Sequence, residues 1–126
     1  MTTFVGLDNV LSARTAIAER LHRTPVFSSA TLGPHVYLKA ELFQRTGSFK
    51  PRGVLTKLAS LTEQERRRGV IGISAGNHAQ ALGYCSALEE VDCLVVMWEG
   101  ASAQKIAATR DYGADVDLRA GGPGEA

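Results

Sequence analysis

Cysteine is scarce in this sequence: the 126 residues include only Cys85 and Cys93. The two are eight positions apart, and neither belongs to a C-x-x-C pair or has a histidine close by in the chain. This spacing argues against a metal site, a redox motif and a disulfide framework. We expect both thiols to be reduced residues of a hydrophobic core.

Long hydrophobic runs and a charge bias are also missing. No apolar stretch approaches the length of about 18 residues that a membrane-spanning helix needs, and the first ten residues lack a signal-like pattern. The 14 basic and 13 acidic residues leave a net charge of +1. Nothing in this balance favours nucleic acid or an anionic membrane as a partner. We therefore expect a cytoplasmic protein.

Nucleotide-binding glycine motifs are absent as well. The sequence contains neither a G-x-G-x-x-G nor a P-loop. Ser102 and Lys105 form an S-x-x-K, but no S-D-N or K-T-G follows, so we interpret Ser102 as a helix cap.

What is present is a globular composition with alternating strand and helix patterns. With 44% hydrophobic and 21% charged residues, the chain can form one domain with a real core. The apolar runs "VIGIS" (70–74) and "CLVVM" (93–97) are typical of strands buried on both faces of a parallel sheet. "ADVDL" (114–118) predicts an edge strand, and helices are expected between these three. The pattern predicts an α/β fold with an open parallel Rossmann-like sheet of β-α-β-α-β order.

The sequence also predicts an N-terminal helical segment before this sheet. A first helix is expected from Asp8 or Asn9 to Leu21, followed by a turn at Pro25 and a strand around 36–38. A second helix is expected near residue 50, and Ser48 is its predicted N-cap. We expect its buried face to consist of Val54, Leu55, Leu58 and Leu61, and that of the helix before "CLVVM" to include Ala81, Cys85 and Leu88. Residues 119–126 have the composition of a loop.

Lys50 is the first candidate for chemistry. It follows a Thr-Gly-Ser turn, within "TGSFKPRG" (46–53), and Pro51 falls in the first turn of the expected helix. A lysine amine can become a nucleophile toward carbonyl compounds when its surroundings activate it. An ordinary exposed lysine in a first helical turn is the alternative, and this segment alone favours it.

The segment "SAGNHAQ" (74–80) is the second candidate. It lies where a buried strand ends and a helix begins, which is the place where open α/β sheets bind ligands. Gly76 allows close approach to the main chain, and the N–H groups of Asn77 and His78 suit a carboxylate or phosphate. An ordinary turn with Asn77 as the N-cap is an equally good interpretation at this point.

Taken together, three segments resemble a known family. They are "LKAELFQRTGSFKPRG" (38–53), "GISAGNHAQALGY" (72–84) and "AQKIAATRDYGADVDL" (103–118), and "RTPVF" (23–27) adds to them. In this order they resemble the pyridoxal-phosphate (PLP) enzymes of fold type II, with the closest likeness to threonine/serine dehydratases and serine racemase. A cysteine synthase would show S-V-K-D-R and T-S-G-N-T-G instead.

The resemblance implies a role for each matching residue. Lys50 would form the Schiff base with PLP and move the proton at the substrate α-carbon, Phe49 would flank the cofactor ring, and Asn77 would bond its phenolic oxygen. The substrate carboxylate would be held by Ser74, Ala75, Gly76, Asn77 and His78. The implied reaction is an α,β-elimination that turns threonine or serine into a 2-oxo acid and ammonia, without a metal.

The resemblance also implies that residues 1–126 are the N-terminal portion of a tryptophan synthase β-like domain. The family's glycine-rich phosphate loop comes later in the chain, and "AGGPGEA" (120–126) is not that loop. We expect this short chain to be inactive alone, as a fragment or as one half of a split enzyme with a complementing C-terminal half. The full-length family implies a homo-oligomer.

Other functions stay open from the sequence. Threonine dehydratase, serine dehydratase, serine racemase and threonine synthase activities are not separated by these motifs. A non-catalytic remnant that binds an amino acid or a partner chain is a further alternative.

Overall fold

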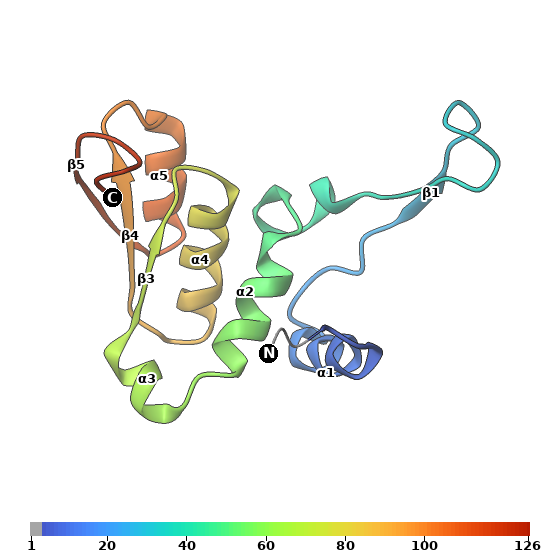
Figure 1. Ribbon diagram of the computed structural model, residues 1–126, viewed down its shortest axis with the longest axis horizontal. Helices are drawn as coiled ribbons and strands as arrows, with labels where there is room; N and C mark the ends of the chain where they lie inside the picture. Colours follow the sequence, from blue (N-terminus) through green and yellow to red (C-terminus); the bar gives the residue numbers. More distant parts are fainter. Residues whose placement is uncertain (1–3) are drawn as a thin grey trace.

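The structure, a computed structural model, describes residues 4–126 (Figure 1). Its elements are α1 (Leu7–Ile17), β1 (Val26–Ser28), β2 (Tyr37–Lys39), the 3-10 turns η1 (Glu41–Phe43) and η2 (Arg45–Gly47), α2 (Lys50–Ala59), α3 (Glu63–Arg68), β3 (Val70–Ile73), α4 (Asn77–Leu88), β4 (Cys93–Trp98), α5 (Ala103–Asp111) and β5 (Asp115–Ala120). Within these described residues, no helix is both long and apolar enough to cross a membrane.

A parallel sheet of order β3-β4-β5 forms one end of the molecule. Helices α4 and α5 connect its strands and lie along it (Figure 1). The predicted β-α-β-α-β order is therefore confirmed, and so is the edge position of the last strand. β5 continues to Ala120, two residues into the segment expected to be a loop.

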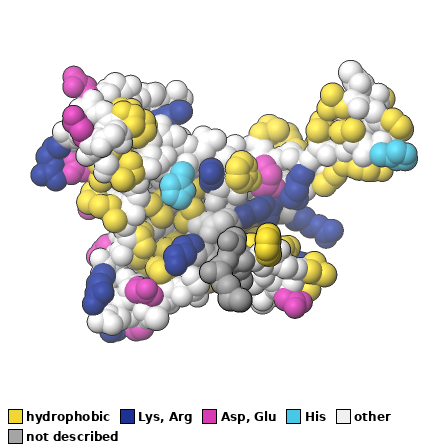
Figure 2. All heavy atoms as spheres, viewed as in Figure 1, with side chains coloured by type: hydrophobic (Ala, Val, Ile, Leu, Met, Phe, Trp, Pro, Cys, Tyr) yellow, Lys and Arg dark blue, Asp and Glu magenta, His cyan; other side chains and the backbone are white. Residues whose placement is uncertain are grey.

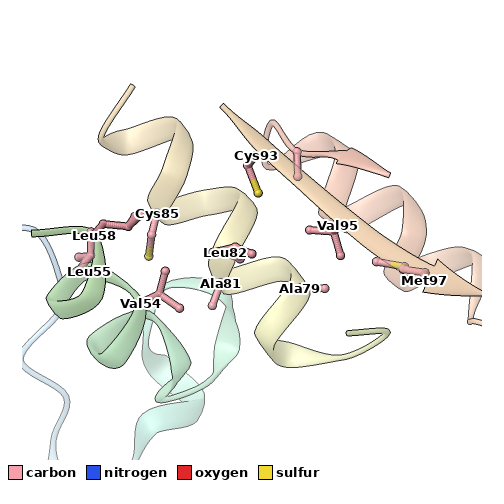
Figure 3. Close-up of a cluster of buried hydrophobic side chains, with 11 residues drawn as sticks. Val54, Leu55, Leu58, Ala79, Ala81, Leu82, Cys85, Cys93, Val95 and Met97 are labelled. Carbon is pink, nitrogen blue, oxygen red and sulfur yellow. The ribbon is translucent and has the colours of Figure 1, made fainter. Parts of the chain in front are cut away.

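The core lies on both sides of α4. Figure 3 shows side chains of α2 on one side of this helix and side chains of β4 on the other. Leu55 and Leu58 of α2 and Val95 and Met97 of β4 are all at most 1% exposed. The residues of α4 between them are mostly small, so α2 and the sheet can both approach its backbone closely.

Both cysteines belong to this core, as predicted. Cys85 and Cys93 are free and buried. Burial raises the pKa of the Cys85 thiol to about 12, so this sulfur stays protonated and acts as a small apolar side chain.

The strand β3 differs from the prediction. It was expected to be buried on both faces, yet Ile71 is 67% and Ile73 54% exposed. The physical reason is that Ile71 and Ile73 alternate along β3 with Gly72, which packs against Leu82 of α4, so these two side chains point to the face away from that helix. Leu88, expected on the buried face of α4, is also exposed, because it is the last residue of that helix.

In the N-terminal part, Ile17 and Leu21 pack against this core. The helix α1 ends at Ile17 rather than Leu21, and none of its residues is buried. β1 and β2 pair antiparallel, with Val26 opposite Lys39, and the hairpin protrudes from the molecule (Figure 1). The sequence predicted no strand at β1, which directly follows the turn expected at Pro25, whereas the strand expected around 36–38 is confirmed as β2.

The hairpin is apolar on its surface. Val26, Phe27, Tyr37 and Leu38 are exposed, and Figure 2 shows hydrophobic side chains gathered on it. Exposed apolar patches of this kind mark surfaces that bind other polypeptide or ligands.

Gly69 provides a test of how closely β3 and the turn before β4 are packed. Its φ of +77° lies in the left-handed region, and an added Cβ would come within 2.8 Å of the Asp92 carbonyl oxygen, which also accepts a hydrogen bond from the Val70 N–H. We expect Gly69→Ala to lower the free energy of unfolding by about 3 kcal/mol, from backbone strain plus overlap.

The matched control is Gly100→Ala. Gly100 has a φ of +86°, but nothing lies within 4 Å of an added Cβ. This change should cost only about 1 kcal/mol. Urea unfolding of both variants measures the difference, and equal losses would contradict the packing described here.

Candidate functional site

Lys50 is the first residue of α2. The residue before it, Phe49, occupies the N-cap position with a helical backbone, so the helix starts one residue later than a Ser48 cap would require. The Ser48 hydroxyl nevertheless accepts a hydrogen bond from the Lys50 N–H at 3.4 Å. Pro51 lies in the first turn, as predicted, and is fully buried. The backbone of Lys50 is therefore held from both sides.

The amine of Lys50 lies beside an aromatic ring. Its Nζ atom is 5.1 Å from the centroid of the Phe49 ring, which is 60% exposed. A cation at this distance from a ring is attracted to its electron-rich face. Lys50, a half-buried residue, thus presents its amine next to an accessible aromatic surface.

A cavity of about 450 Å³ opens beside this amine. Its walls come from α2, β3 and α4, and its polar groups are the side chains of Lys50, Lys57 and His78. The remaining lining is mainly apolar: Phe49, Gly53, Val54, Leu58, Leu61, Val70, Ile71 and Leu82. A cavity of this size and character is typical of small-molecule sites.

The turn between β3 and α4 ends next to His78, which lines the same cavity. The Ser74 N–H donates to the Val96 carbonyl at 3.2 Å, and the Ser74 hydroxyl accepts from the Gly76 N–H at 3.2 Å. Gly76, not Asn77, is the N-cap of α4, so the turn is not the Asn-capped one that the sequence left open. Asn77 is the first helical residue, and its side chain is exposed.

Two features of this turn suit an anionic ligand. The N–H groups at the start of a helix have no acceptor within the helix, and the helix dipole favours negative charge there. A Cβ added to Gly76 would meet nothing within 4 Å. A carboxylate therefore has room to approach the main chain at this point.

The structure brings some of the predicted site residues together. Lys50, Phe49 and His78 line one cavity. Ser74, Ala75, Gly76 and Asn77 do not line it; they form the turn immediately before His78. Lys57 was not predicted, although its position two turns after Lys50 on one helix could have indicated it.

The sequence also missed an ion pair that holds the first turn of α2. Glu41 accepts hydrogen bonds from Arg52 at 2.8 and 2.7 Å and from the Thr24 hydroxyl at 2.5 Å. The hydrogen bond from Arg52 holds the pKa of the Glu41 carboxyl below its ordinary value, and the same contact raises the pKa of Arg52. This ion pair could not be predicted from the sequence, because Glu41 and Arg52 belong to different elements and no regular spacing relates them.

The described residues fit the reactive end of PLP. Lys50 offers a primary amine for an aldehyde, Phe49 offers an aromatic surface beside it, and the turn before His78 offers main-chain donors with open space. The chemistry of these groups matches the cofactor that the sequence resemblance implies.

Comparison with known proteins agrees with this fit. The family model described as "Pyridoxal-phosphate dependent enzyme" matches residues 17–126. The chain is 44% identical over 119 residues to the catabolic L-threonine dehydratase of Escherichia coli (strain K12), and 43% identical over 112 residues to the L-threo-3-hydroxyaspartate ammonia-lyase of Saccharomyces cerevisiae. These alignments cover 90% and 86% of this chain, and 36% and 34% of those proteins.

The fold is also similar to that of solved enzymes. The crystal structure of serine racemase from Dictyostelium discoideum matches with a TM-score of 0.85 and 40% identity, over 92% of this chain and 40% of that one. The chain spans just over a third of the length of the curated relatives it matches. Since the family model covers most of the sequence, the chain belongs to the family of pyridoxal-phosphate dependent enzymes.

Proposed function

We propose that the protein acts as a PLP-dependent lyase that converts threonine or serine into a 2-oxo acid and ammonia, with Lys50 as the residue that carries the cofactor. The observation that carries this proposal is the Lys50 amine at a cavity that also reaches the first turn of α4. The named activities of two relatives, threonine dehydratase and hydroxyaspartate ammonia-lyase, support elimination from a 3-hydroxy amino acid.

Lys50 has two tasks in this proposal. Its amine would hold the cofactor at the cofactor's aldehyde group. When bound, the cofactor supplies an electron sink for bond cleavage at the substrate α-carbon. The Lys50 amine would take the α-proton. It would pass a proton to the departing β-hydroxyl, which leaves as water, and addition of one water to the eliminated product would release the 2-oxo acid and ammonia.

The turn from Ser74 to His78 orients the substrate in this proposal. Its main-chain donors, at the positive end of α4, would bind the substrate carboxylate. Asn77 would bond the phenolic oxygen of the cofactor, and Phe49 would lie against its ring. The open space beside Gly76 supports this assignment, because a carboxylate needs close approach to the backbone.

We further propose that turnover needs polypeptide beyond these 126 residues, either continuous with them or supplied by a complementing C-terminal half. The exposed apolar side chains of the hairpin and of β3 support this, since additional polypeptide would cover them. The proposal is also supported by the alignment with the threonine dehydratase, in which the chain covers only 36% of that protein. A cytoplasmic location is part of the proposal and is supported by the free thiols of Cys85 and Cys93.

A racemase is the second candidate. The fold similarity to serine racemase favours it. The same amine would remove the α-proton, but a proton would return to the opposite face of the α-carbon and no hydroxyl would leave. Chiral analysis of serine after incubation separates this outcome from elimination.

The cofactor assignment predicts selective labelling of Lys50. After incubation with PLP and reduction with borohydride, peptide mapping should place the pyridoxyl group on Lys50. Lys57→Ala is the matched control, because Lys57 lies on the same helix and lines the same cavity. Lys50→Ala should abolish the selective label, while Lys57→Ala should retain it. A label spread evenly over the lysines would contradict the assignment.

The activity proposal predicts a dependence on additional polypeptide. The 126-residue chain with PLP should form no 2-oxobutanoate from threonine, since it spans only 36% of the length of the threonine dehydratase it matches. Addition of the C-terminal portion of a relative, or expression of a longer form, should restore turnover in the presence of Lys50 and not in Lys50→Ala. The measurement is 2-oxo acid formation coupled to lactate dehydrogenase. Turnover by the 126 residues alone would show that no further polypeptide is needed.

A further inference from the structure

An ion pair joins the first turn of α2 to the loop before it. The Arg52 guanidinium donates from Nε to Glu41 Oε2 at 2.8 Å and from Nη2 to Glu41 Oε1 at 2.7 Å. The side chains are 30% and 16% exposed, so water screens the pair only partly. A two-bond contact between a guanidinium and a carboxylate fixes direction as well as distance. The orientation of the first turn is therefore coupled to Glu41.

The same pair also binds the segment that leads into β1. Thr24, which is 4% exposed, donates its hydroxyl hydrogen to Glu41 Oε1 at 2.5 Å, and Arg52 Nη2 donates to the His22 carbonyl at 3.2 Å. Lys39 adds a hydrogen bond to the Thr24 carbonyl at 3.3 Å. Three separate parts of the chain thus meet at the Glu41 carboxylate, and one of its partners, Arg52, lies two residues after Lys50 in α2.

Gln44 anchors the N-terminal end of the loop that runs from Gln44 to Lys50. Its amide exchanges two hydrogen bonds with the main chain of His22, at 3.0 and 2.8 Å, and accepts a third from the Arg45 N–H at 2.9 Å. Gln44 is 4% exposed, so these bonds satisfy a buried amide. The loop between Gln44 and Lys50 is consequently anchored at both ends.

The backbone of this anchored loop is strained at Thr46. Its φ of 61° lies in the left-handed region, which is unfavourable for a β-branched residue. Its hydroxyl oxygen is buried and has no hydrogen-bond partner among the residues that the structure describes. A backbone conformation of this kind persists only where the surroundings over-determine it, and such sites cluster around functional groups.

We propose that the Glu41–Arg52 pair is a positioning device for Lys50, which holds the first turn of α2 so that the Lys50 amine meets the cofactor aldehyde in the cavity. This inference rests on the proposed function, and it assigns Glu41 and Arg52 as positioning residues. Because Lys50 is the first residue of the helix, the direction of its side chain follows the backbone of that turn. A small displacement of a reacting group is enough to slow a reaction strongly.

The test compares Arg52→Ala and Arg52→Lys with Arg66→Ala. Arg66 is a matched control: it pairs with Glu89 at 3.2 Å, is 26% exposed and also bonds the end of α2, at the Leu58 carbonyl, far along the helix from Lys50. Two readouts are needed. The first is the ratio of borohydride-fixed pyridoxyl label on Lys50 to that on Lys57. The second is amide hydrogen exchange over residues 49–53, without cofactor.

In Arg52→Ala we expect the Lys50 to Lys57 ratio to fall roughly tenfold and exchange over residues 49–53 to accelerate. The labelling ratio of Arg52→Lys should lie between those of Arg52→Ala and the unchanged protein. Lysine keeps the positive charge but lacks the planar guanidinium that makes two hydrogen bonds to Glu41. Glu41→Gln should lower the ratio in the same direction, which covers the case that Arg52→Ala does not fold. Arg66→Ala should leave the ratio unchanged.

Two results would overturn the proposal: an unchanged labelling ratio in the Arg52 and Glu41 variants, or an equal change in Arg66→Ala. If the unchanged protein shows no preference for Lys50 over Lys57, the proposed function fails instead. Hydrogen exchange without cofactor then decides separately whether the pair fixes the first turn of α2.

Discussion

The close packing of α2 against α4 is the constraint on which the rest of the site depends. Leu55 and Leu58 of α2 face Ala81 and Cys85 of α4 (Figure 3), and all four are buried. Small residues on α4 let the helices approach, and the Cys85 sulfur lies 3.8 Å from the Pro51 carbonyl in the first turn of α2. Since α2 begins at Lys50 and α4 begins at Asn77, this packing places the start of each helix near one cavity.

Much of this arrangement could be predicted from the sequence, because it depends on local patterns. The apolar runs before and after α4 predicted two parallel strands, and the strand-to-helix junction predicted a ligand-binding turn there. The exposure of Ile71 could not be predicted in this way, since burial of a strand depends on which segments pack beside it. The Glu41–Arg52 pair is likewise non-local, and the left-handed backbone at Thr46 has no local sequence signal.

The molecule divides into two parts that differ in whether their apolar side chains are buried. Around α4 the apolar side chains are buried, whereas the hairpin of β1 and β2 and the outer face of β3 expose theirs. The first part positions the candidate amine and the turn before His78. Under the proposal that turnover needs additional polypeptide, that polypeptide would bury the apolar area of the second part, and this burial would link the stability of the fold to completion of the site.

The central claim is that Lys50 is the point at which this protein holds its cofactor. The most direct measurement is a crystal structure of the protein, in its longest available form, grown with PLP. We expect electron density continuous from Lys50 Nζ into the cofactor, with the cofactor ring beside Phe49 in the cavity formed by α2, β3 and α4. Density joined to another lysine, or a cofactor bound away from this cavity, would contradict it.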